Sequence, residues 1–552
     1  MLLATRALAT RYSRSCYSLL ATRALATLLT VLSPYFPVPI LKMSNSLNTI
    51  AQHYHERTKY DPETISSKGR GIDWSKQPIP YKEYKIGRVF DLKPYLSSDR
   101  QVAPESEDAY WLQLSLFLLA SYGLTAQLQT VYGNPIYLRA APSAGGLYPA
   151  EIYLVSQGNS WLPAGLYNYQ VATHSLVHFW DSEVWLQLQA ACFDAPVLAH
   201  VEFALVTTAV FYRSAWRYED RAYRRIFLDT GHLLGNIELS ACINGYKSYS
   251  LGGFNDEALN SLLYLDPLEE GAIAVVPLLN LAQNSLPDIA RETALASKTT
   301  TEYPKIADGD LLAYLHQATK IETKQLPKRV SLTEDKYNFP FCTKVATAID
   351  TSIEWGEQLA ELENTILKRR STRNYSGSDI TLDQLKALLH FTYQAEDYLD
   401  QGLDANPDYF TLDLIQTFIA VSGVSGLDTG CYYYAPQAQE LRQIRFKNFR
   451  RELHYLCLGQ NLGKDAAAIV FHTADLEGAI TQHGDRAYRY LHLDAGHLGQ
   501  RLNLAAIRLK LGVSGIAGFF DDRVNEVLGI PPQEAVLYLT TIGCPQLKQG
   551  ND

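Results

Sequence analysis

Two arginines and a serine alternate in the sequence RRSTRNY, which spans Arg369 to Tyr375. On an extended segment, Arg369, Ser371 and Arg373 point to one side and offer two guanidinium groups and a hydroxyl to a phosphate dianion. A solvated basic run after a helix is the alternative, because positive charge also suits the negative end of a helix. Taken alone, the segment leaves both interpretations open.

A run of small residues lies in the first half of the chain, within APSAGGLYPAEIYLV at 141–155. Ser143, Ala144, Gly145 and Gly146 follow Pro142 and precede a strand-like run. A backbone without bulk can approach a flat ligand closely and offer it N–H donors. A plain turn leading into a strand explains the same residues equally well.

Three further groups invite a chemical reading. Arg217 and Tyr218 place a phenol beside a cation, which would make the hydroxyl easier to ionise and able to shuttle a proton. Arginine stays charged and cannot itself be the base, and a surface pair is the alternative. The other two groups are Asp229 with His232 and Asp494 with His497, which stand at i, i+3; we interpret them as structural hydrogen-bonded pairs rather than catalytic ones.

The elements that carry these residues occur twice. DRAYR stands at 220–224 and again at 485–489, an offset of 265, and 19 of 51 positions are identical between 220–270 and 485–535. The sequence therefore predicts two copies of one fold. EIYLVS at 151 and FALVTTAVF at 203 predict strands, and the apolar stretch at 220–243 predicts a helix that is buried on both sides. Residues 351–368 also have helical spacing, with Thr351 or Ser352 as the expected cap.

Composition limits the class of protein. The 552 residues are 47% hydrophobic and 19% charged, which excludes a disordered chain. A net charge of -9 gives no general electrostatic reason to bind nucleic acid or an anionic membrane. Seven scattered cysteines without CxxC spacing indicate neither a disulfide framework nor a zinc site, so we expect a reducing, cytoplasmic location and no metal.

The chain divides into five expected regions. Residues 1–42 lack acidic residues and contain LLATRALAT twice, so we expect either a mis-assigned start, with Met43 as the true one, or a transit peptide. Residues 43–90 form an N-terminal extension. The first repeat covers 91–290, a Thr/Lys-rich linker covers 291–350, and the second repeat covers 351–552.

Together, RRSTR, PSAGGLYP and the two DRAYR segments resemble the FMN-dependent nitroreductase family, and within it the SagB-type, or thiazole/oxazole, dehydrogenase branch. The resemblance implies an α+β fold in which two subunits share two flavin sites. It implies that the RRSxR segment of one subunit grips the phosphate while the PSAG segment of the other packs on the flavin ring. It also places Gly518, preceded by Ala517, beside flavin N5; a glycine that ends a helix is the alternative, since Gly253 matches it.

The two repeats depart from that pattern in complementary ways. The first keeps Pro142 to Gly145 but has no RRSxR. The second keeps Arg369, Arg370, Ser371 and Arg373, but Pro407-Asp-Tyr-Phe-Thr replaces the small residues. If opposite halves contribute the two motifs, one complete site and one dead site result. We therefore expect an intramolecular pseudo-dimer of two tandem nitroreductase-like domains that binds one FMN.

The resemblance implies hydride transfer through flavin N5. One version takes hydride from a peptide azoline and passes electrons to oxygen; the other takes it from NAD(P)H and reduces a nitro or quinone acceptor. Arg217-Tyr218 stands where the azoline-oxidising branch often has Lys-Tyr, so the sequence leaves both open. A degenerate scaffold that no longer turns over is the alternative from another class.

Overall fold

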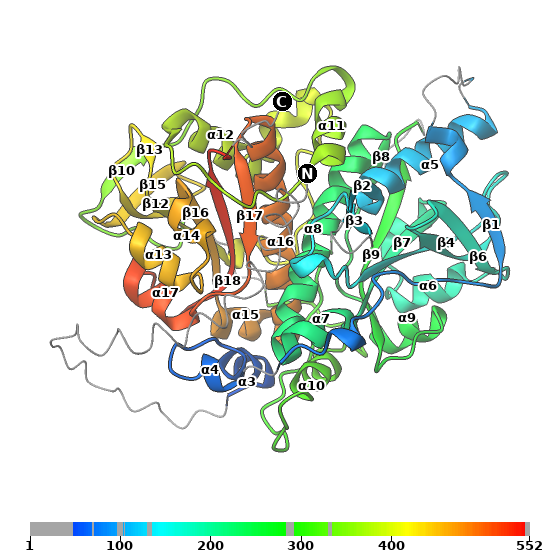
Figure 1. Ribbon diagram of the computed structural model, residues 1–552. Helices are drawn as coiled ribbons and strands as arrows, with labels where there is room; N and C mark the ends of the chain where they lie inside the picture. Colours follow the sequence, from blue (N-terminus) through cyan, green and yellow to red (C-terminus); the bar gives the residue numbers. More distant parts are fainter. Residues whose placement is uncertain are drawn as a thin grey trace, which may run out of the picture.

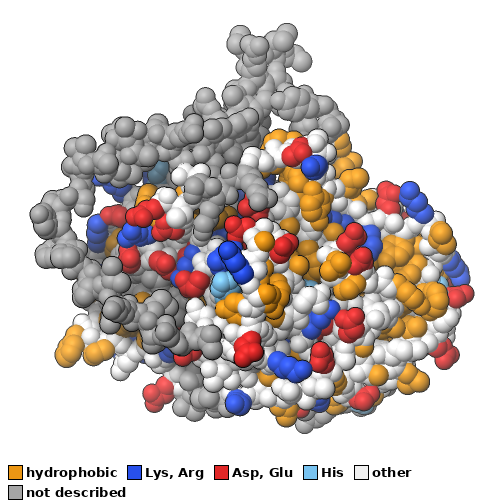
Figure 2. Space-filling model, turned by 90° about the horizontal axis from the view of Figure 1, so that it is seen from below, with side chains coloured by type: hydrophobic (Ala, Val, Ile, Leu, Met, Phe, Trp, Pro, Cys, Tyr) orange, Lys and Arg blue, Asp and Glu red, His pale blue; other side chains and the backbone are white. Residues whose placement is uncertain are grey.

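The computed structural model describes residues 48–68, 71–96, 103, 105–129, 135–282, 292–328 and 334–546. The atypical leader at 1–42 lies outside these residues. Within the described part of the chain, no helix has both the length and the apolar character needed to cross a bilayer. On the face in Figure 2, acidic and basic side chains are interspersed rather than gathered by sign.

Two seven-stranded sheets have the same strand order. The first runs β1-β6-β5-β4-β7-β9-β8 and the second runs β10-β15-β14-β12-β16-β18-β17, and neighbouring strands pair antiparallel in both. The predicted α+β class and the two tandem domains are therefore confirmed. The strands of the first sheet are β1 (Arg88–Asp91), β4 (Ala150–Ser156), β5 (Gly165–Gln170), β6 (Ser175–Trp180), β7 (Phe203–Val210), β8 (Tyr246–Ser248) and β9 (Glu270–Asn280). Those of the second are β10 (Thr343–Ala346), β12 (Ile415–Val421), β14 (Gly430–Ala435), β15 (Glu440–Arg445), β16 (Ala468–Asp475), β17 (Gly512–Ile516) and β18 (Glu534–Gly543).

Smaller elements surround the sheets. Two short ribbons pair β2 (Leu124–Gln129) with β3 (Pro135–Arg139), and β11 (Ile380–Thr381) with β13 (Val424–Ser425). The first half carries α5 (Glu107–Tyr122), α6 (Trp185–Ala191), α7 (Phe211–Tyr218), α8 (Ala222–Ile243) and α9 (Asp256–Leu262). The second carries α11 (Ala360–Lys368), α12 (Leu382–Tyr393), α13 (Arg450–Leu456), α14 (Asn461–Asp465), α15 (Leu476–His483), α16 (Ala487–Arg508) and α17 (Asp521–Leu528).

The two long helices α8 and α16 lie side by side between the sheets (Figure 1). Every residue of α8 from Ala222 to Ala241 is buried, as expected for a helix that packs on both sides. The helices touch at Gly231 and Gly496: a Cβ on Gly231 would collide with the carbonyl of Leu493, and one on Gly496 with the carbonyl of Leu228. Glycine is needed here because two backbones meet directly.

One hydrophobic core runs through both halves. It joins Leu154 and Ile226 of the first repeat to Leu491 and Leu537 of the second, all nearly inaccessible to water. Apolar burial on this scale is typical of an obligate dimer interface rather than of two domains on a tether. The predicted intramolecular pseudo-dimer is therefore confirmed.

The predicted helix at 351–368 is wrong in its first half. The α-helix begins at Ala360, and Thr351 and Ser352 do not cap it. Gly356, Gln358 and Leu359 have positive φ, so the chain turns before the helix starts. The apolar spacing reflects burial of Ile353 and Trp355 in the core of the second half rather than a helical face.

The N-terminal extension and the expected linker each contribute a helix to the same end of the molecule (Figure 1). These helices are α3 (Ile50–Arg57) and α10 (Leu311–Ala318); the short α4 (Ile65–Lys68) follows α3. HERTKY at 55–60 aligns with HQATKI at 316–321, an offset of 261 rather than 265. Thr58 bonds the carbonyl of Tyr54 at 2.8 Å, and Thr319 bonds that of Leu315 at 2.8 Å. The repeat unit therefore includes this extension, which the sequence analysis did not find.

Candidate functional site

The RRSTR segment of the second half docks against the first half. Arg369 is 3% exposed, and its Nε donates to the carbonyl of Ala140 at 2.6 Å while Nη2 donates to that of Arg139 at 3.2 Å. Arg370 Nη2 donates to the carbonyl of Thr125 at 2.7 Å. These acceptors lie on the β2/β3 ribbon and at its end, directly before Pro142. The two motifs that the sequence assigned to opposite halves are therefore neighbours.

The rest of the segment runs along β17 and is more accessible. Thr372 N donates to the carbonyl of Val513 at 2.8 Å, which holds the backbone extended. Ser371 is half-buried and Arg373 is exposed, with Nη1 at 3.4 Å from Ser514 Oγ. Burial lowers the pKa of Arg369 to about 10, and the charges of Arg370 and Arg373 add to the effect. Of the three alternating side chains, Ser371 and Arg373 have the freedom to reach an incoming anion.

The small-residue loop, Ser143 to Gly146, is held in place by the carboxylate of Asp229 on α8. Ser143 Oγ donates to this carboxylate at 2.6 Å and Ala144 N donates to it at 3.1 Å. Burial raises the pKa of Asp229 to about 7, although these bonds oppose the shift. Gly145 and Gly146 both have positive φ, 68° and 66°, so the loop needs glycine at both positions.

A cluster of aromatic and cationic side chains faces this loop. A Cβ on Gly145 would lie 2.9 Å from the hydroxyl of Tyr218 and 3.6 Å from Arg217 Nη1. The guanidinium carbon of Arg225 lies 3.9 Å from the centre of the Tyr218 ring. Arg225 also faces Tyr60, which belongs to the N-terminal extension, with 6.0 Å between the guanidinium carbon and the ring centre.

The cations beside Tyr218 act in the expected direction, but the net shift of its pKa is upward and the hydroxyl is harder to ionise than a free phenol. Burial raises the pKa of Tyr218 by more than Arg225 and Arg217 lower it. Tyr60 behaves in the opposite way: burial raises its pKa, but Arg225 and Arg221 outweigh this effect and the net shift is downward. Of the two phenols, Tyr60 is the one whose pKa is lowered.

Ala517 and Gly518 complete this region, which we call the open position. A Cβ on Gly518 would lie 3.3 Å from Leu458, 3.7 Å from Arg225 Nη2 and 3.9 Å from the Tyr60 ring. Both residues are half-buried, Gly145 is exposed, and Pro142, Ser143 and Ala144 are half-buried. Gly145 lies next to Tyr218 and Gly518 lies next to Arg225, so the surfaces from the two halves border the same cluster of side chains and remain accessible.

The pseudo-symmetric region, which we call the filled position, is closed by side chains. Phe410 and Tyr490 take the places of Gly145 and Arg225, and their rings stack at 5.3 Å. A Cβ on Gly252 would lie 2.7 Å from Tyr490 and 2.8 Å from Phe410, and one on Gly253 would collide with Leu295. The Tyr490 hydroxyl donates to the carbonyl of Leu295 at 2.9 Å. Here Gly253 serves close packing.

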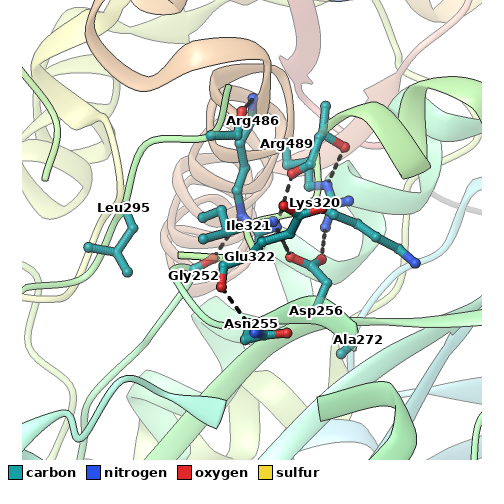
Figure 3. Close-up of polar contacts among 12 residues, drawn as sticks. Gly252, Asn255, Asp256, Ala272, Leu295, Lys320, Ile321, Glu322, Arg486 and Arg489 are labelled. Atoms are coloured by element: carbon teal, nitrogen blue, oxygen red, sulfur yellow. Dashed lines mark hydrogen bonds and ion pairs between the residues drawn. The ribbon is translucent and has the colours of Figure 1, made fainter. Parts of the chain in front are cut away.

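Two arginine clamps support these positions, and sequence reasoning missed them. Arg221 and Arg224 bind the carboxylate of Asp521 at 2.9 and 2.8 Å. On the other side, Arg486 and Arg489 bind Asp256 at 2.6 and 2.8 Å (Figure 3). Each pair reaches from one half to the other. The identity of these arginines and aspartates in both repeats was a signal that could have revealed them.

Each clamp also holds one of the duplicated helices. Arg224 Nη2 donates to the carbonyl of His55 at 2.7 Å, and Arg489 Nη2 donates to that of His316 at 2.7 Å. Tyr60 N donates to Asp521 at 2.9 Å, and Ile321 N donates to Asp256 at 2.8 Å. After the first duplicated helix, the residue that binds the clamp is therefore Tyr60, at the open position. After the second, it is Ile321, at the filled position.

The interpretation of the Asp/His residues as hydrogen-bonded pairs needs correction. Asp229 binds the small-residue loop, whereas His232 bonds Gln500 Oε1 at 3.0 Å and the Tyr538 hydroxyl at 2.9 Å. Asp494 accepts from Thr411 N at 2.6 Å, and His497 lies 3.4 Å from Glu238. At i, i+3 on a helix buried all round, the aspartate and the histidine reach different neighbours.

A family model, described as "Nitroreductase family", matches residues 117–278 and 366–544, one segment in each half. The chain belongs to the nitroreductase family. A crystal structure of a protein described as a nitroreductase from Anabaena variabilis has 64% sequence identity and a TM-score of 0.84, covering 90% of this chain and 100% of that one. As a member of this family, the protein is an oxidoreductase.

Curated relatives match parts of this nitroreductase-family chain. MJ1384 of Methanocaldococcus jannaschii, described as a nitroreductase, is 30% identical over 183 residues, which are 33% of this chain and 90% of that protein. The trifolitoxin-processing protein TfxB of Rhizobium leguminosarum bv. trifolii is 33% identical over 171 residues, 30% of this chain and 46% of TfxB. The microcin B17-processing protein McbC of Escherichia coli is 28% identical over 139 residues, 23% of this chain. The match spans about half the length of TfxB and of McbC.

The cavity beside the filled position does not compete with the open position as a ligand site. It measures about 30 Å³ and is lined by Cys192, Tyr249, Gly253, Leu295 and others. That volume suits one or two water molecules and no larger ligand. Among the residues that the structure describes, no group of three or more His, Cys, Asp or Glu side chains is arranged to hold a metal ion.

Proposed function

We propose that this nitroreductase-family chain is an FMN-dependent oxidoreductase with one flavin at the open position. One observation carries the proposal: the phosphate-gripping segment of the second half and the small-residue loop of the first meet across the interface, with 2.6 Å between Arg369 Nε and the Ala140 carbonyl. FMN supplies a hydride-accepting and hydride-donating N5. The contribution of the chain is to bind, orient and charge-balance that ring.

The residues at the open position fit a flavin. Pro142, Ser143, Ala144 and Gly145 present a low, half-exposed surface, and no atom lies within 4 Å of a Cβ built on Gly146. Ala517 and Gly518 face them from the other half. Ser371 and Arg373 would bind the phosphate, and Arg370 would add positive charge. Arg369 would act mainly by fixing the loop, because two of its nitrogens already bind carbonyl groups.

Two substrate classes remain in view within this proposal. Transfer of hydride from NAD(P)H to a nitro or quinone acceptor is supported by family membership and by likeness to proteins described as nitroreductases. Oxidation of a peptide azoline, with oxygen as acceptor, is supported by likeness to TfxB and McbC, which are peptide-processing proteins. A scaffold without turnover is the contrasting alternative.

Absorbance and turnover of the purified chain test this function. A flavin spectrum, with bleaching by NADH or NADPH and recovery on adding a quinone, is expected for the first class; bleaching only by an azoline peptide supports the second. A colourless protein that rejects FMN supports the scaffold. We propose that Tyr218, beside Arg217, holds and passes on a proton without contacting the flavin, so Tyr218→Phe should slow substrate oxidation but leave FMN bound. Loss of flavin in that variant would refute this role.

A further inference from the structure

Arg225 is a buried cation at the open position with no carboxylate beside it. It is 5% exposed, and no Asp or Glu of the described chain lies within ion-pair distance. Its Nη1 makes a long bond, 3.5 Å, to the carbonyl of Arg221. Asp229 is close enough to feel its charge, but that carboxylate already binds Ser143 and Ala144. A buried charge normally has a partner of opposite sign.

The pseudo-symmetry of the chain shows that the fold does not need an arginine here. The clamps formed by Arg221 with Arg224 and by Arg486 with Arg489 are kept in both copies and hold the architecture. At the position of Arg225, the other copy has Tyr490, which packs on Phe410. The fold therefore accepts a neutral ring at this position. Because the other copy keeps a buried cation there, we attribute that cation to binding of a ligand.

The neighbours of Arg225 differ between the copies in the same way. Tyr60 and Tyr218 correspond to Ile321 and His483. The guanidinium lies over the face of Tyr218, 3.9 Å from the ring centre, and one side of it reaches Tyr60, whose pKa is lowered, against the effect of burial, by the charge and hydrogen bond of Arg225. A guanidinium held by one face still presents its N–H edge, the geometry that binds a carboxylate with two parallel bonds.

We propose that Arg225 is a specificity-determining residue that binds the carboxylate of the substrate, with Tyr60 and Tyr218 as the walls of this subsite. Arg225 Nη2 lies 3.7 Å from the Cβ position of Gly518, so a carboxylate bound there is adjacent to the ring site. The substrate that this subsite selects is therefore a small molecule with a carboxylate group. This inference rests on the proposed function, because it places the substrate next to a flavin at the open position.

Titration of the flavin-loaded protein with benzoate and with neutral benzamide tests the proposal, using the change in flavin absorbance. Arg225→Gln should weaken benzoate binding by about 10- to 100-fold and leave benzamide binding unchanged. Arg225→Lys should restore part of the affinity. Arg523→Gln is the matched control, since Arg523 is an exposed arginine on α17 paired with Glu526, and it should have no effect on either ligand.

The outcomes separate this inference from the proposed function. Equal benzoate binding by wild type and Arg225→Gln overturns the inference, as does loss of flavin from Arg225→Gln, which would assign the guanidinium to the cofactor. If Arg225→Gln fails to fold, Tyr60→Ile introduces the residue of the filled side and should also weaken benzoate selectively; unchanged binding there contradicts the subsite. If wild type binds no flavin, the proposed function fails, and calorimetric titration of benzoate still decides the role of Arg225.

Discussion

The open and filled positions are two copies of one site, of which the first is accessible and the second is closed by side chains. Both retain an arginine clamp, an aspartate bound to the loop and a glycine shortly before the last helix of the half, Gly253 before α9 and Gly518 before α17. They differ in the residues that face inward: Gly145 and Arg225 on one side, Phe410 and Tyr490 on the other. The clamps that support the fold were thus kept twice, whereas most of the residues that we propose to contact a ligand were kept once. Comparison of the copies separates the two roles within a single chain.

Exchange of residues between the copies has the largest expected effect. Gly145→Phe places the ring of the filled side on the open loop, at a φ of 68° that disfavours a side chain, beside the Tyr218 hydroxyl. We expect complete loss of flavin from the purified protein, measured by absorbance after denaturation. The mirror change, Phe410→Gly, should not create a second site, because Leu295 still blocks Gly253. Flavin retention in Gly145→Phe would contradict the assignment of the loop.

The clamps test whether architecture and ligand binding are separable. Asp521→Ala and Asp256→Ala each leave two buried arginines without a carboxylate, so each should destabilise the protein by about 3 to 5 kcal/mol in chemical denaturation. Only Asp521→Ala should also weaken flavin binding, because Asp521 holds Arg221, which donates to the carbonyl of Ala517 at the open position. Equal loss of flavin in both variants would show that the copies are not functionally distinct.

Substitutions in the RRSTR segment, which we propose to bind the FMN phosphate, should have a smaller effect on FMN affinity. Charged hydrogen bonds contribute about 1.5 to 3 kcal/mol, so Arg373→Ala should weaken FMN binding by roughly 10- to 100-fold. Arg369→Ala should weaken FMN binding by another route, because the small-residue loop loses the side chain that fixes it. Arg369→Ala should also lower thermal stability, since it leaves the Ala140 carbonyl without its donor, whereas Arg373→Ala should not. Changes to Asp408 or Tyr409, at the filled position, should leave FMN affinity unchanged in a fluorescence titration.

The smallest effect concerns pH. Burial raises the pKa of Asp494 to about 7, well above its unfolded value, so its contribution to stability is present below about pH 4 and is lost as pH rises through 7. An asparagine side chain at this position stays neutral at every pH, so the stability of Asp494→Asn relative to wild type should rise by on the order of 2 to 3 kcal/mol between about pH 5 and pH 8. Urea unfolding of both proteins at about pH 5 and pH 8 measures the two free energies of unfolding. If their difference is the same at both pH values, the pKa of Asp494 is not raised and its surroundings are more polar than the structure indicates.

The sequence predicted the parts of the fold that depend on periodicity and repetition. Strands β4 and β7, the buried helices α8 and α16, and the pairing of the two halves follow from apolar runs and from the repeated DRAYR segment. The start of α11 was mispredicted because Ile353 and Trp355 are buried by tertiary packing rather than by a helical stripe. Spacing alone does not distinguish these two causes.

At the candidate site, the sequence indicated which motifs meet but not the residues between them. Tyr60 lies 165 positions before Arg225 and reaches it only because the clamp at Asp521 fixes the N-terminal extension. The second copy of that extension escaped notice because its offset is 261 rather than 265. The net pKa shift of Tyr218 depends on burial, which a charge pattern in sequence does not report.

The number of flavins per chain tests the central claim most directly. The protein is loaded with excess FMN, freed of unbound cofactor, and weighed intact by native mass spectrometry. One FMN per chain, lost in Gly145→Phe and retained in Tyr409→Ala, is the result expected if the copies share one open position. Two FMN molecules per chain would show that Phe410, Tyr490 and Leu295 do not close the filled position, and would contradict the account.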